Sequence, residues 1–281
     1  MAISVPTSVS RSISAVKRQI ASLDKADFVN SQLYMPSAHL LGRKSKYLRP
    51  TLVLLSAYAI GADPKEYVDL ATAAELLHTS SLVHDDIIDK DRVRRGVPSV
   101  HVKYGVEPAI LGGDALISKA IQFSSEYGKQ VMDSMANAAL EMCAGELLDY
   151  SFYKEGKTPN LNQYLEIARL KSASLIGASC SSVPIHLKSR GAKEFYNFGI
   201  NFGIAFQIKD DLSDYKSEDK AGRRKPNIVF SIAKNEGMDN KASADKAESI
   251  MERYAADGLS GIKDRRIRDM LSRYAEMLSS Y

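Results

Sequence analysis

Long stretches of helical periodicity limit the fold of this chain more than any other feature of its sequence. Apolar residues recur at helical intervals, while the strict alternation typical of a half-buried strand is scarce. The 281 residues include only 17 glycines and 9 prolines. An all-β fold needs a turn about every 8 to 12 residues, so these turn-forming residues are too few for one. We therefore predict an all-α protein, a single-domain bundle of about ten or more helices around a central cavity, over residues 1–281.

Proline and glycine residues place the ends of these helices. We expect one helix to start at Pro50 and end near Gly61, and the next to run from Pro64 to about Arg92, with a loop at 96–98 after it. Gly199 and Gly203 would lie on one helix face and let another helix approach closely. Further helices are predicted at 108–127, 129–153, 161–182, 192–215, 226–235 and 240–281.

Charge and cysteine content exclude several functions. The net charge of +4 is small, and basic residues are mixed with acidic ones, so no nucleic-acid partner is expected. Cys143 and Cys180 lie too far apart for a CxxC metal or redox motif, which favours a reducing compartment and predicts a cytoplasmic protein. No apolar run reaches 18 residues, so no transmembrane segment is predicted.

The first 23 residues allow two interpretations. They are rich in serine and carry Arg11, Lys17 and Arg18 with no acidic residue, as organelle transit peptides do. Val16 and Ile20, however, recur at helical spacing and suit a first core helix equally well.

An acidic cluster lies on the helix predicted after Pro64. Asp85, Asp86 and Asp89 occupy positions i, i+1 and i+4, so Asp85 and Asp89 share one face. Three carboxylates repel one another unless a cation neutralises them, and hard oxygen ligands of this kind suit Mg²⁺ that also binds a phosphate. The alternative is an acidic helix face exposed to solvent.

A second acidic cluster follows the same pattern. Gln207, Asp210, Asp211 and Asp214 form a polar stripe on an otherwise apolar helix. Two such stripes fit the walls of one cavity in which metal ions bridge a polyanion. Arginine and lysine residues suited to binding phosphate also occur near both clusters, although each alone could be an ordinary surface charge. These cations are Lys46, Arg49, Arg94, Arg95 and Lys171.

An ordered series of motifs resembles the trans-prenyltransferase family, also called polyprenyl diphosphate synthases. The series spans most of the chain and is far more specific than one DDxxD motif. It comprises Lys46-Tyr-Leu-Arg49-Pro50, Glu75-Leu-Leu-His78, Asp85-Asp86-Ile-Ile-Asp89, Arg94-Arg95-Gly96-Val-Pro98, Gly113-Asp114, Gly145-Glu146, Lys171-Ser172 and Phe206-Gln207-Ile-Lys-Asp210-Asp211-Leu-Ser-Asp214.

The resemblance implies condensation of isopentenyl diphosphate with an allylic diphosphate by ionisation, carbon–carbon bond formation and proton loss. It implies that the six aspartates hold roughly two or three Mg²⁺ ions on the allylic diphosphate. It further implies a homodimer. Arg94, Lys171 and Gln207 would help to bind and ionise the allylic substrate, with Asp210 also catalytic. The other implied substrate contacts are Lys46, Arg49, His78, Arg95, Ser172 and Lys225.

Two departures from the family pattern are visible. The segment after the second cluster, 216–225, is shorter than the usual Gly-Lys-x-x-Gly-x-Asp element, and Lys225 stands where its last lysine is expected. Lys44 and Ser45 replace the Gly-Gly that usually precedes Lys-x-x-Arg-Pro. Neither departure removes an implied metal ligand.

Product length should depend on Ser80 and Ser81, which lie one helical turn before Asp85. A turn rises about 5.4 Å, close to one isoprene unit, so small side chains there let the product grow. We expect geranylgeranyl diphosphate or a longer polyprenyl diphosphate. The alternatives are a terpene cyclase or head-to-head synthase with the same diphosphate site, or a non-catalytic partner subunit.

Overall fold

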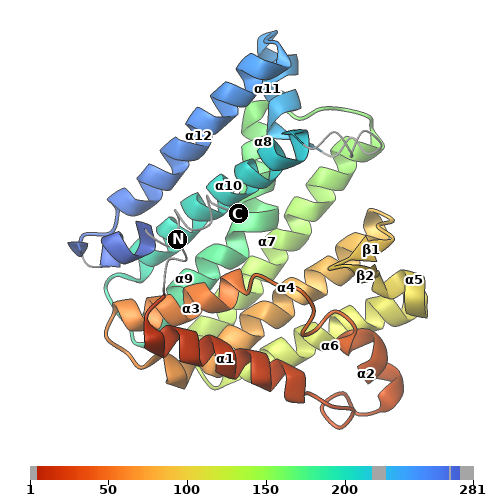
Figure 1. Cartoon of the computed structure of the whole chain (residues 1–281), viewed down its shortest axis with the longest axis vertical. Helices are drawn as coiled ribbons and strands as arrows, with labels where there is room; N and C mark the ends of the chain where they lie inside the picture. The colour runs from red at the N-terminus through yellow and green to blue at the C-terminus, as the bar shows by residue number, and fades with distance from the viewer. Residues whose placement is uncertain (1–4, 217–225, 266, 273–281) are drawn as a thin grey trace. The chain divides into compact units, whose positions relative to one another are not determined.

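The computed structural model describes residues 5–216, 226–265 and 267–272, and these residues are mostly helical. They form twelve labelled α-helices, two short turns of other helical types and one small hairpin (Figure 1). The prediction of an all-α protein is confirmed.

The chain divides into two compact units. Unit 2 comprises Val5–Met135 and Ser182–Ser189, and unit 1 comprises Ala136–Ser181 and the described residues of Arg190–Tyr281. The single domain over 1–281 stays a prediction.

Unit 2 contains the elements of the first half of the chain. They are α1 (Thr7–Ser22), α2 (Ser31–Ala38), α3 (Leu48–Ala59), the 3₁₀ turn η1 (Pro64–Tyr67), α4 (Val68–Ile88), β1 (Val93–Arg94), β2 (Val97–Pro98), α5 (Val100–Tyr104) and α6 (Val106–Ser125). The helix α4 packs along α6 and also contacts α3 and α1. Val16 and Ile20 of α1 are buried, as the core-helix interpretation of the N-terminal segment predicts.

The carboxyl end of α4 differs from the sequence prediction. The helix ends at Ile88, with Asp89 as its C-cap, and not at Arg92. Lys90 adopts a left-handed conformation with φ +58°, and the Asp91 amide donates to the Asp86 carbonyl at 2.9 Å. This is a Schellman-type termination, which usually uses glycine. Because Lys90 stands at that position, the sequence carried no stop signal there.

A tight hairpin follows α4 where a loop was expected. The antiparallel strands β1 and β2 pair Val93 with Pro98 and Arg94 with Val97. The two residues between them, Arg95 and Gly96, have φ of +52° and +78°. Two positive φ values in a two-residue connection are typical of a type I′ turn. The hairpin therefore holds Arg94 in a strand and Arg95 in the turn.

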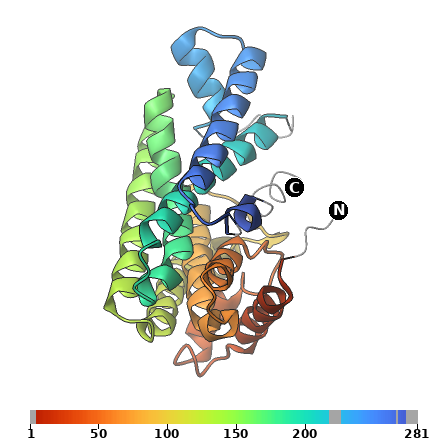
Figure 2. The same cartoon turned by 90° about the vertical axis from the view of Figure 1, so that its left-hand side faces the viewer.

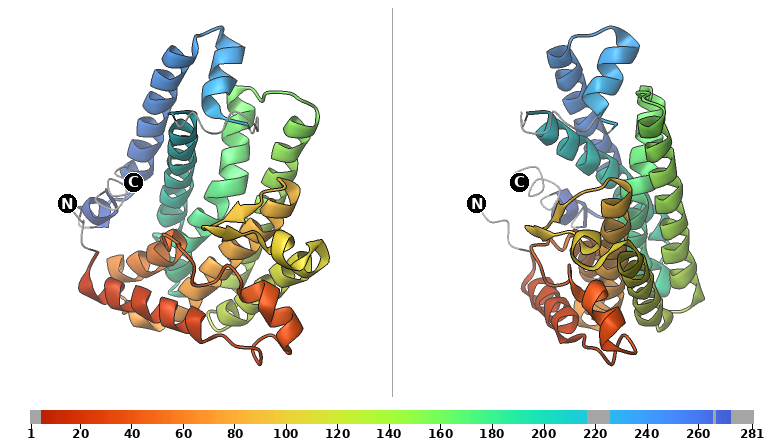
Figure 3. Two further views of the ribbon diagram at one scale, coloured as in Figure 1. Left: turned by 45° about the vertical axis from the view of Figure 1, so that its right-hand side comes forward. Right: turned by 90° about the vertical axis from the view of Figure 1, so that its right-hand side faces the viewer.

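Unit 1 contains most of the second half of the chain. Its elements are α7 (Lys129–Lys154), α8 (Leu161–Ala168), the π-helical turn η2 (Arg169–Ala173), α9 (Ser174–His186), α10 (Ala192–Lys216), α11 (Ile228–Glu236) and α12 (Asn240–Ser260), although the first residues of α7 and the last residues of α9 belong to unit 2. The helices α11 and α12 form a helical hairpin, which Figure 2 shows clearly. The helix α12 also packs along α10 (Figure 3). A core of buried side chains from α8, α10, α11 and α12 joins these helices.

Two glycines of α10 allow it to approach its neighbours closely, as predicted. A Cβ on Gly199 would lie 2.7 Å from the Cα of Gly177 on α9, and one on Gly203 would lie 2.6 Å from the Cα of Ala173. Neither side chain would fit without moving a backbone. The close contact fixes α10, which carries the second acidic cluster, against η2 and α9.

Candidate active site

The first acidic cluster lies at the carboxyl end of α4 in unit 2. Asp85 and Asp89 are half-buried, whereas the side chain of Asp86 is completely buried. The Asp89 amide donates to the Asp85 carbonyl at 2.8 Å, so these two residues are held one helical turn apart. The helix thus presents two carboxylates near the surface and a third beneath them.

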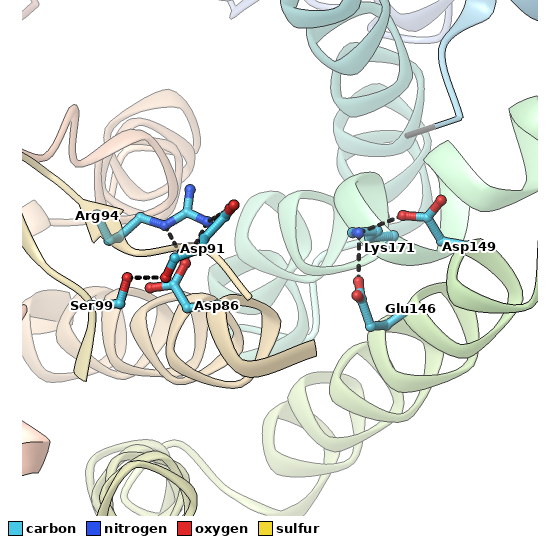
Figure 4. Close-up of polar contacts among 7 residues, drawn as sticks. All are labelled: Asp86, Asp91, Arg94, Ser99, Glu146, Asp149 and Lys171. Carbon is cyan, nitrogen blue, oxygen red and sulfur yellow. Dashed lines mark hydrogen bonds and ion pairs between the residues drawn. The ribbon is translucent and has the colours of Figure 1, made fainter. Parts of the chain in front are cut away.

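Arg94 neutralises the buried carboxylate of this cluster. Its Nη2 and Nε atoms lie 2.6 and 2.7 Å from Oδ1 of Asp86, and Nη2 also lies 3.1 Å from Oδ2 of Asp91 (Figure 4). Ser99 donates to the Asp91 carbonyl and so fastens this end of the hairpin. Burial raises the pKa of Asp86, and the hydrogen bond and positive charge of Arg94 oppose that shift. A buried carboxylate requires such a partner, because an unpaired buried charge is very costly.

Arg95 points to a different carboxylate of the same helix. Its Nη2 atom donates to Oε1 of Glu75 at 3.2 Å, and its Nη1 atom donates to the Leu40 carbonyl at 3.0 Å. Ser45 donates to the same Oε1 atom of Glu75 at 2.7 Å. Burial raises the pKa of Glu75, while Arg95, Ser45 and Arg49 act in the opposite direction. Two neighbouring arginines are therefore anchored at two separate points along α4.

His78 lies among these arginines in unit 2. Its ring is partly exposed, but its Nδ1 atom is buried. Burial, together with the positive charges of Arg49, Arg95 and Arg94, lowers the pKa of His78 well below its usual value. These causes favour the neutral imidazole, which can donate one hydrogen bond and accept another.

The remaining predicted residues of unit 2 surround this group. Lys46 is exposed and Arg49 is half-buried at the start of α3. Ser80 is buried, with 2% of its surface exposed. Ser81 is half-buried, and its hydroxyl donates to the His78 carbonyl at 2.9 Å. Arg49 and Arg95 thus lie near His78 in unit 2, and Lys46 lies in the segment just before α3.

Lys171 occupies the π-helical turn η2 of unit 1. Its Nζ atom lies 2.6 Å from Oε2 of Glu146 and 2.6 Å from Oδ2 of Asp149, both on α7 (Figure 4). The approach of η2 to α7 depends on Gly145, because a Cβ there would lie 2.4 Å from the Lys171 amide nitrogen. A π turn has one extra residue per turn and is frequent at functional sites. The helical stretch predicted over 161–182 is confirmed, and the π turn within it is an addition that the sequence did not indicate.

A hydrogen-bonded chain connects η2 to the second acidic cluster. Ser172 donates to Oε1 of Gln207 at 2.6 Å, and Nε2 of Gln207 donates to Oδ1 of Asp211 at 2.9 Å. The amide of Ile228, the first residue of α11, donates to Oδ2 of Asp211 at 3.1 Å. Burial raises the pKa of Asp211 to about 7, and the hydrogen bonds from Gln207 and Ile228 oppose that shift.

The three aspartates of the second cluster therefore differ in surroundings. Asp211 is buried and bonds within unit 1, while Asp210 and Asp214 are exposed on α10. Lys225, a predicted substrate contact, lies outside the described residues, as does most of the shortened segment at 216–225.

The donor set of both clusters suits Mg²⁺ that is shared with a phosphate ligand. Within the described residues, no group of three or more His, Cys, Asp or Glu side chains is arranged to hold a metal ion by itself. Asp86 is paired with Arg94, although its second oxygen, Oδ2, is buried without a hydrogen-bond partner. Mg²⁺ typically binds one or two carboxylates and completes its shell with water and substrate phosphates. The residues present therefore fit this ion, and the metal roles of the six aspartates stay a prediction.

Several residues of this site were missed by sequence reasoning. Asp91 forms an ion pair with Arg94, which also pairs with Asp86. Glu75 forms an ion pair with Arg95, and Asp149 forms one with Lys171. Asp149 could have been found, because it follows Glu146 by three residues and so lies on the same face of a predicted helix. Glu75 is an acidic residue within an apolar helical stretch, which is the usual sequence sign of a buried, paired charge.

The described helices include none that is both long and apolar enough to span a bilayer. Both cysteines are free, Cys143 exposed and Cys180 buried.

Comparisons with known proteins agree on one family. The family model described as Polyprenyl synthetase matches residues 30–254. A geranylgeranyl pyrophosphate synthase of Geoglobus acetivorans is 39% identical over 200 residues, which cover 68% of this chain and 62% of the relative. A geranylfarnesyl diphosphate synthase of Natronomonas pharaonis is 34% identical over 241 residues, covering 74% of this chain and 70% of the relative. The match thus spans less than two thirds of the first relative's length.

Solved structures give the same result over nearly the whole chain. A geranylgeranyl pyrophosphate synthetase from Geoglobus acetivorans has a TM-score of 0.89 and 29% identity, covering 97% of this chain and 99% of that one. A geranylgeranyl pyrophosphate synthetase from Pyrococcus horikoshii has a TM-score of 0.78 and 28% identity, covering 97% of both chains.

The all-helical fold that these solved structures share with this chain, together with its two acidic clusters, is that of an isoprenoid-synthase type of protein. Within that type, this chain belongs to the polyprenyl synthetase family, as the match over residues 30–254 shows.

Proposed function

We propose that this protein is a trans-prenyltransferase that condenses isopentenyl diphosphate with an allylic diphosphate. The observation that carries this proposal is the hairpin after α4. It places Arg94 on Asp86 in the acidic cluster, and it places Arg95 on Glu75 beside the segment that holds Lys46 and Arg49. Two cationic sites suit two diphosphates, whereas a terpene cyclase has no need of a second diphosphate site. The presence of all six aspartates argues against a non-catalytic subunit.

Each group of residues then has a separate task. The six aspartates would hold Mg²⁺ on the allylic diphosphate, and Arg94, Lys171 and Gln207 would orient that diphosphate. Lys46, Arg49, His78 and Arg95 bind the diphosphate of isopentenyl diphosphate. Bound Mg²⁺ supplies positive charge that stabilises the departing diphosphate.

Preorganised donors favour ionisation because negative charge develops on the leaving diphosphate where N–H groups already lie. The guanidinium of Arg94 is fixed by Asp86 and Asp91, so it does not need to reorganise when that charge appears. Carbon–carbon bond formation follows at the allylic cation, and the proton that is lost passes to an oxygen of the departing diphosphate. No enzymic nucleophile takes part.

The product is proposed to be geranylgeranyl diphosphate or a longer polyprenyl diphosphate. Small residues at Ser80 and Ser81 support this length, and the relatives named above are geranylgeranyl and geranylfarnesyl synthases.

We also propose that the protein acts as a homodimer in the cytoplasm. Support for the dimer comes from large apolar side chains that α7 leaves exposed at helical spacing, namely Leu140 (69% exposed), Leu147 (66%) and Tyr150 (38%). Two free cysteines are typical of a reducing compartment. Light scattering of the purified protein tests the dimer, and a monomeric mass would refute it.

One assay tests the proposed activity. Purified protein is incubated with labelled isopentenyl diphosphate, Mg²⁺ and, in turn, dimethylallyl, geranyl or farnesyl diphosphate, and the dephosphorylated products are sized. Incorporation should require both a primer and Mg²⁺, and it should stop when EDTA is added. Asp85→Asn serves as the inactive control. Absence of incorporation with every primer would refute the proposal.

A further inference from the structure

Ser45 belongs to a hydrogen-bond network that joins three segments of unit 2. The hydroxyl donates to Oε1 of Glu75 on α4 at 2.7 Å and accepts from the Tyr47 amide at 3.2 Å. The same Oε1 atom also accepts from Nη2 of Arg95 at 3.2 Å. One carboxylate oxygen thus connects the 45–47 segment, the helix α4 and the hairpin turn.

The segment that Ser45 fastens carries the cations at the start of α3. Lys46 lies between Ser45 and Tyr47, which a hydrogen bond connects, and Arg49 lies in the first turn of α3. Tyr47, the N-cap, is left-handed with φ +49°, which is unfavourable for a residue with a Cβ. Such a conformation persists only where surrounding contacts hold it. The bond from the Tyr47 amide to Ser45 is one of these contacts.

The other end of the network fixes Arg95. The side chain of Glu75 is 3% exposed and that of Arg95 is 9% exposed, so neither can adjust freely. Nη1 of Arg95 donates to the Leu40 carbonyl at 3.0 Å, which returns the network to the chain just before Ser45. The network is therefore a closed loop through Leu40, Ser45, Glu75 and Arg95.

We infer that Ser45 and Glu75 are positioning residues for the isopentenyl diphosphate site, holding Lys46, Arg49 and Arg95 in one arrangement without contacting the substrate. This inference rests on the proposed function. Ser45 is also one of the two residues that depart from the Gly-Gly of the family pattern. A hydroxyl there supplies a specific tether that a glycine lacks.

A purely structural role makes a different prediction. Were Ser45 only a partner that satisfies the buried charge of Glu75, its loss would lower stability and leave the affinity for isopentenyl diphosphate unchanged. A positioning role instead weakens the binding of isopentenyl diphosphate selectively. The loss of one hydrogen bond of typical net strength corresponds to a change of about fivefold.

The test compares three variants of the full chain with the wild type. Ser45→Ala removes the tether, and Ser45→Thr keeps a hydroxyl at the same place. Ser56→Ala is the matched control, because among the described residues the Ser56 hydroxyl bonds only to the Leu52 carbonyl of its own helix, α3, at 2.8 Å. Isothermal titration with isopentenyl diphosphate, without an allylic substrate, measures Kd for each variant. Steady-state assays give the two KM values and kcat, and thermal melting monitors folding.

We expect Ser45→Ala to raise the Kd and KM for isopentenyl diphosphate about fivefold, with the KM of the allylic substrate unchanged. Ser45→Thr should restore both values, and Ser56→Ala should match the wild type. An unchanged Kd in folded Ser45→Ala, or an equal rise in the Ser56→Ala control, would overturn the inference while leaving the proposed function standing. If the wild type binds isopentenyl diphosphate but forms no product, the proposed activity fails and the titration still decides the role of Ser45. A wild type that does not bind isopentenyl diphosphate overturns both.

Discussion

Replacing Ser81 by phenylalanine should shorten the product of this protein. Ser81 lies four residues before Asp85 on α4, about 6 Å along the helix axis and on the same face. Its side chain is half-buried, and its hydroxyl turns back to the His78 carbonyl. A phenyl ring cannot turn back in this way and would occupy the space one turn before the acidic cluster. Since one turn, about 5.4 Å, is close to one isoprene unit, the main product should lose about one unit.

Ser80→Phe provides a contrast at the neighbouring position. Ser80 is 2% exposed, so a phenyl ring there overpacks a closed environment at a cost of about 1–3 kcal/mol. For a chain of this size the melting temperature should fall by roughly 2 to 12 °C. Ser81→Phe should melt close to the wild type, because Ser81 is only half-buried.

The measurement is the chain-length distribution of dephosphorylated products by thin-layer or liquid chromatography at matched turnover. Ile88→Phe is the control, since Ile88 is 39% exposed and lies past Asp85 on the helix. A Ser81→Phe product of unchanged length, from protein with normal activity and melting temperature, would refute the idea that this face of α4 limits the product. Equal shortening by Ile88→Phe would show that the effect is not specific to the face.

Three further predictions concern other parts of the site. Arg94→Lys should lower the free energy of unfolding by about 2–4 kcal/mol in chemical denaturation, because lysine cannot reproduce the forked contact with the fully buried Asp86. An unchanged denaturation midpoint would contradict this prediction. Gly145→Ala places a Cβ 2.4 Å from the Lys171 amide nitrogen. Turnover should therefore fall at least about tenfold, and the free energy of unfolding should fall by about 1–3 kcal/mol. Normal turnover would show that η2 can move at little cost. Burial lowers the pKa of His39, whose Nε2 atom donates to the Pro98 carbonyl at 2.8 Å. The unfolded chain therefore binds a proton at this position more readily, and stability should decrease as pH falls below about 6.5. His39→Gln should make this decrease shallower in melting experiments between about pH 7 and 5, and an identical slope would count against the assignment.

Much of the fold could be predicted because apolar periodicity and proline or glycine punctuation mark long helices directly. Pro50 lies in the first turn of α3, which begins at Leu48, and Gly61 follows its end; the predicted limits of α10 and α7 differ from the observed ones by a single residue. The end of α4 was not predicted, because the left-handed residue that follows its C-cap is Lys90, and a lysine does not mark a helix end as a glycine does. The π turn η2 was missed for a related reason. Its residues are ordinary helix formers, and only the packing of Gly145 against Lys171 reveals the extra residue.

The candidate site shows the same division. The order of the motifs identified the aspartates and arginines, because charged residues at fixed spacing can be recognised in a sequence. Which carboxylate each arginine pairs with could not be predicted. That Arg94 selects Asp86 and Arg95 selects Glu75 depends on a two-residue turn with positive φ at both positions. Local sequence favours such a turn at Arg95-Gly96 only in part, since arginine rarely adopts positive φ.

The anchoring of Arg94 and Arg95 has a consequence for how proteins of this kind can diverge. Glu75 and Asp86 are eleven residues apart on one uninterrupted helix, which corresponds to about 16 Å of rise. The separation between the two anchored guanidinium groups is therefore set by helix geometry and not by any loop. Surface segments can be lengthened, shortened or exchanged without altering it. An insertion or deletion between Glu75 and Asp86, by contrast, would change both the spacing and the angle between the two carboxylates at once, so substitution is the route of variation that this stretch of α4 tolerates.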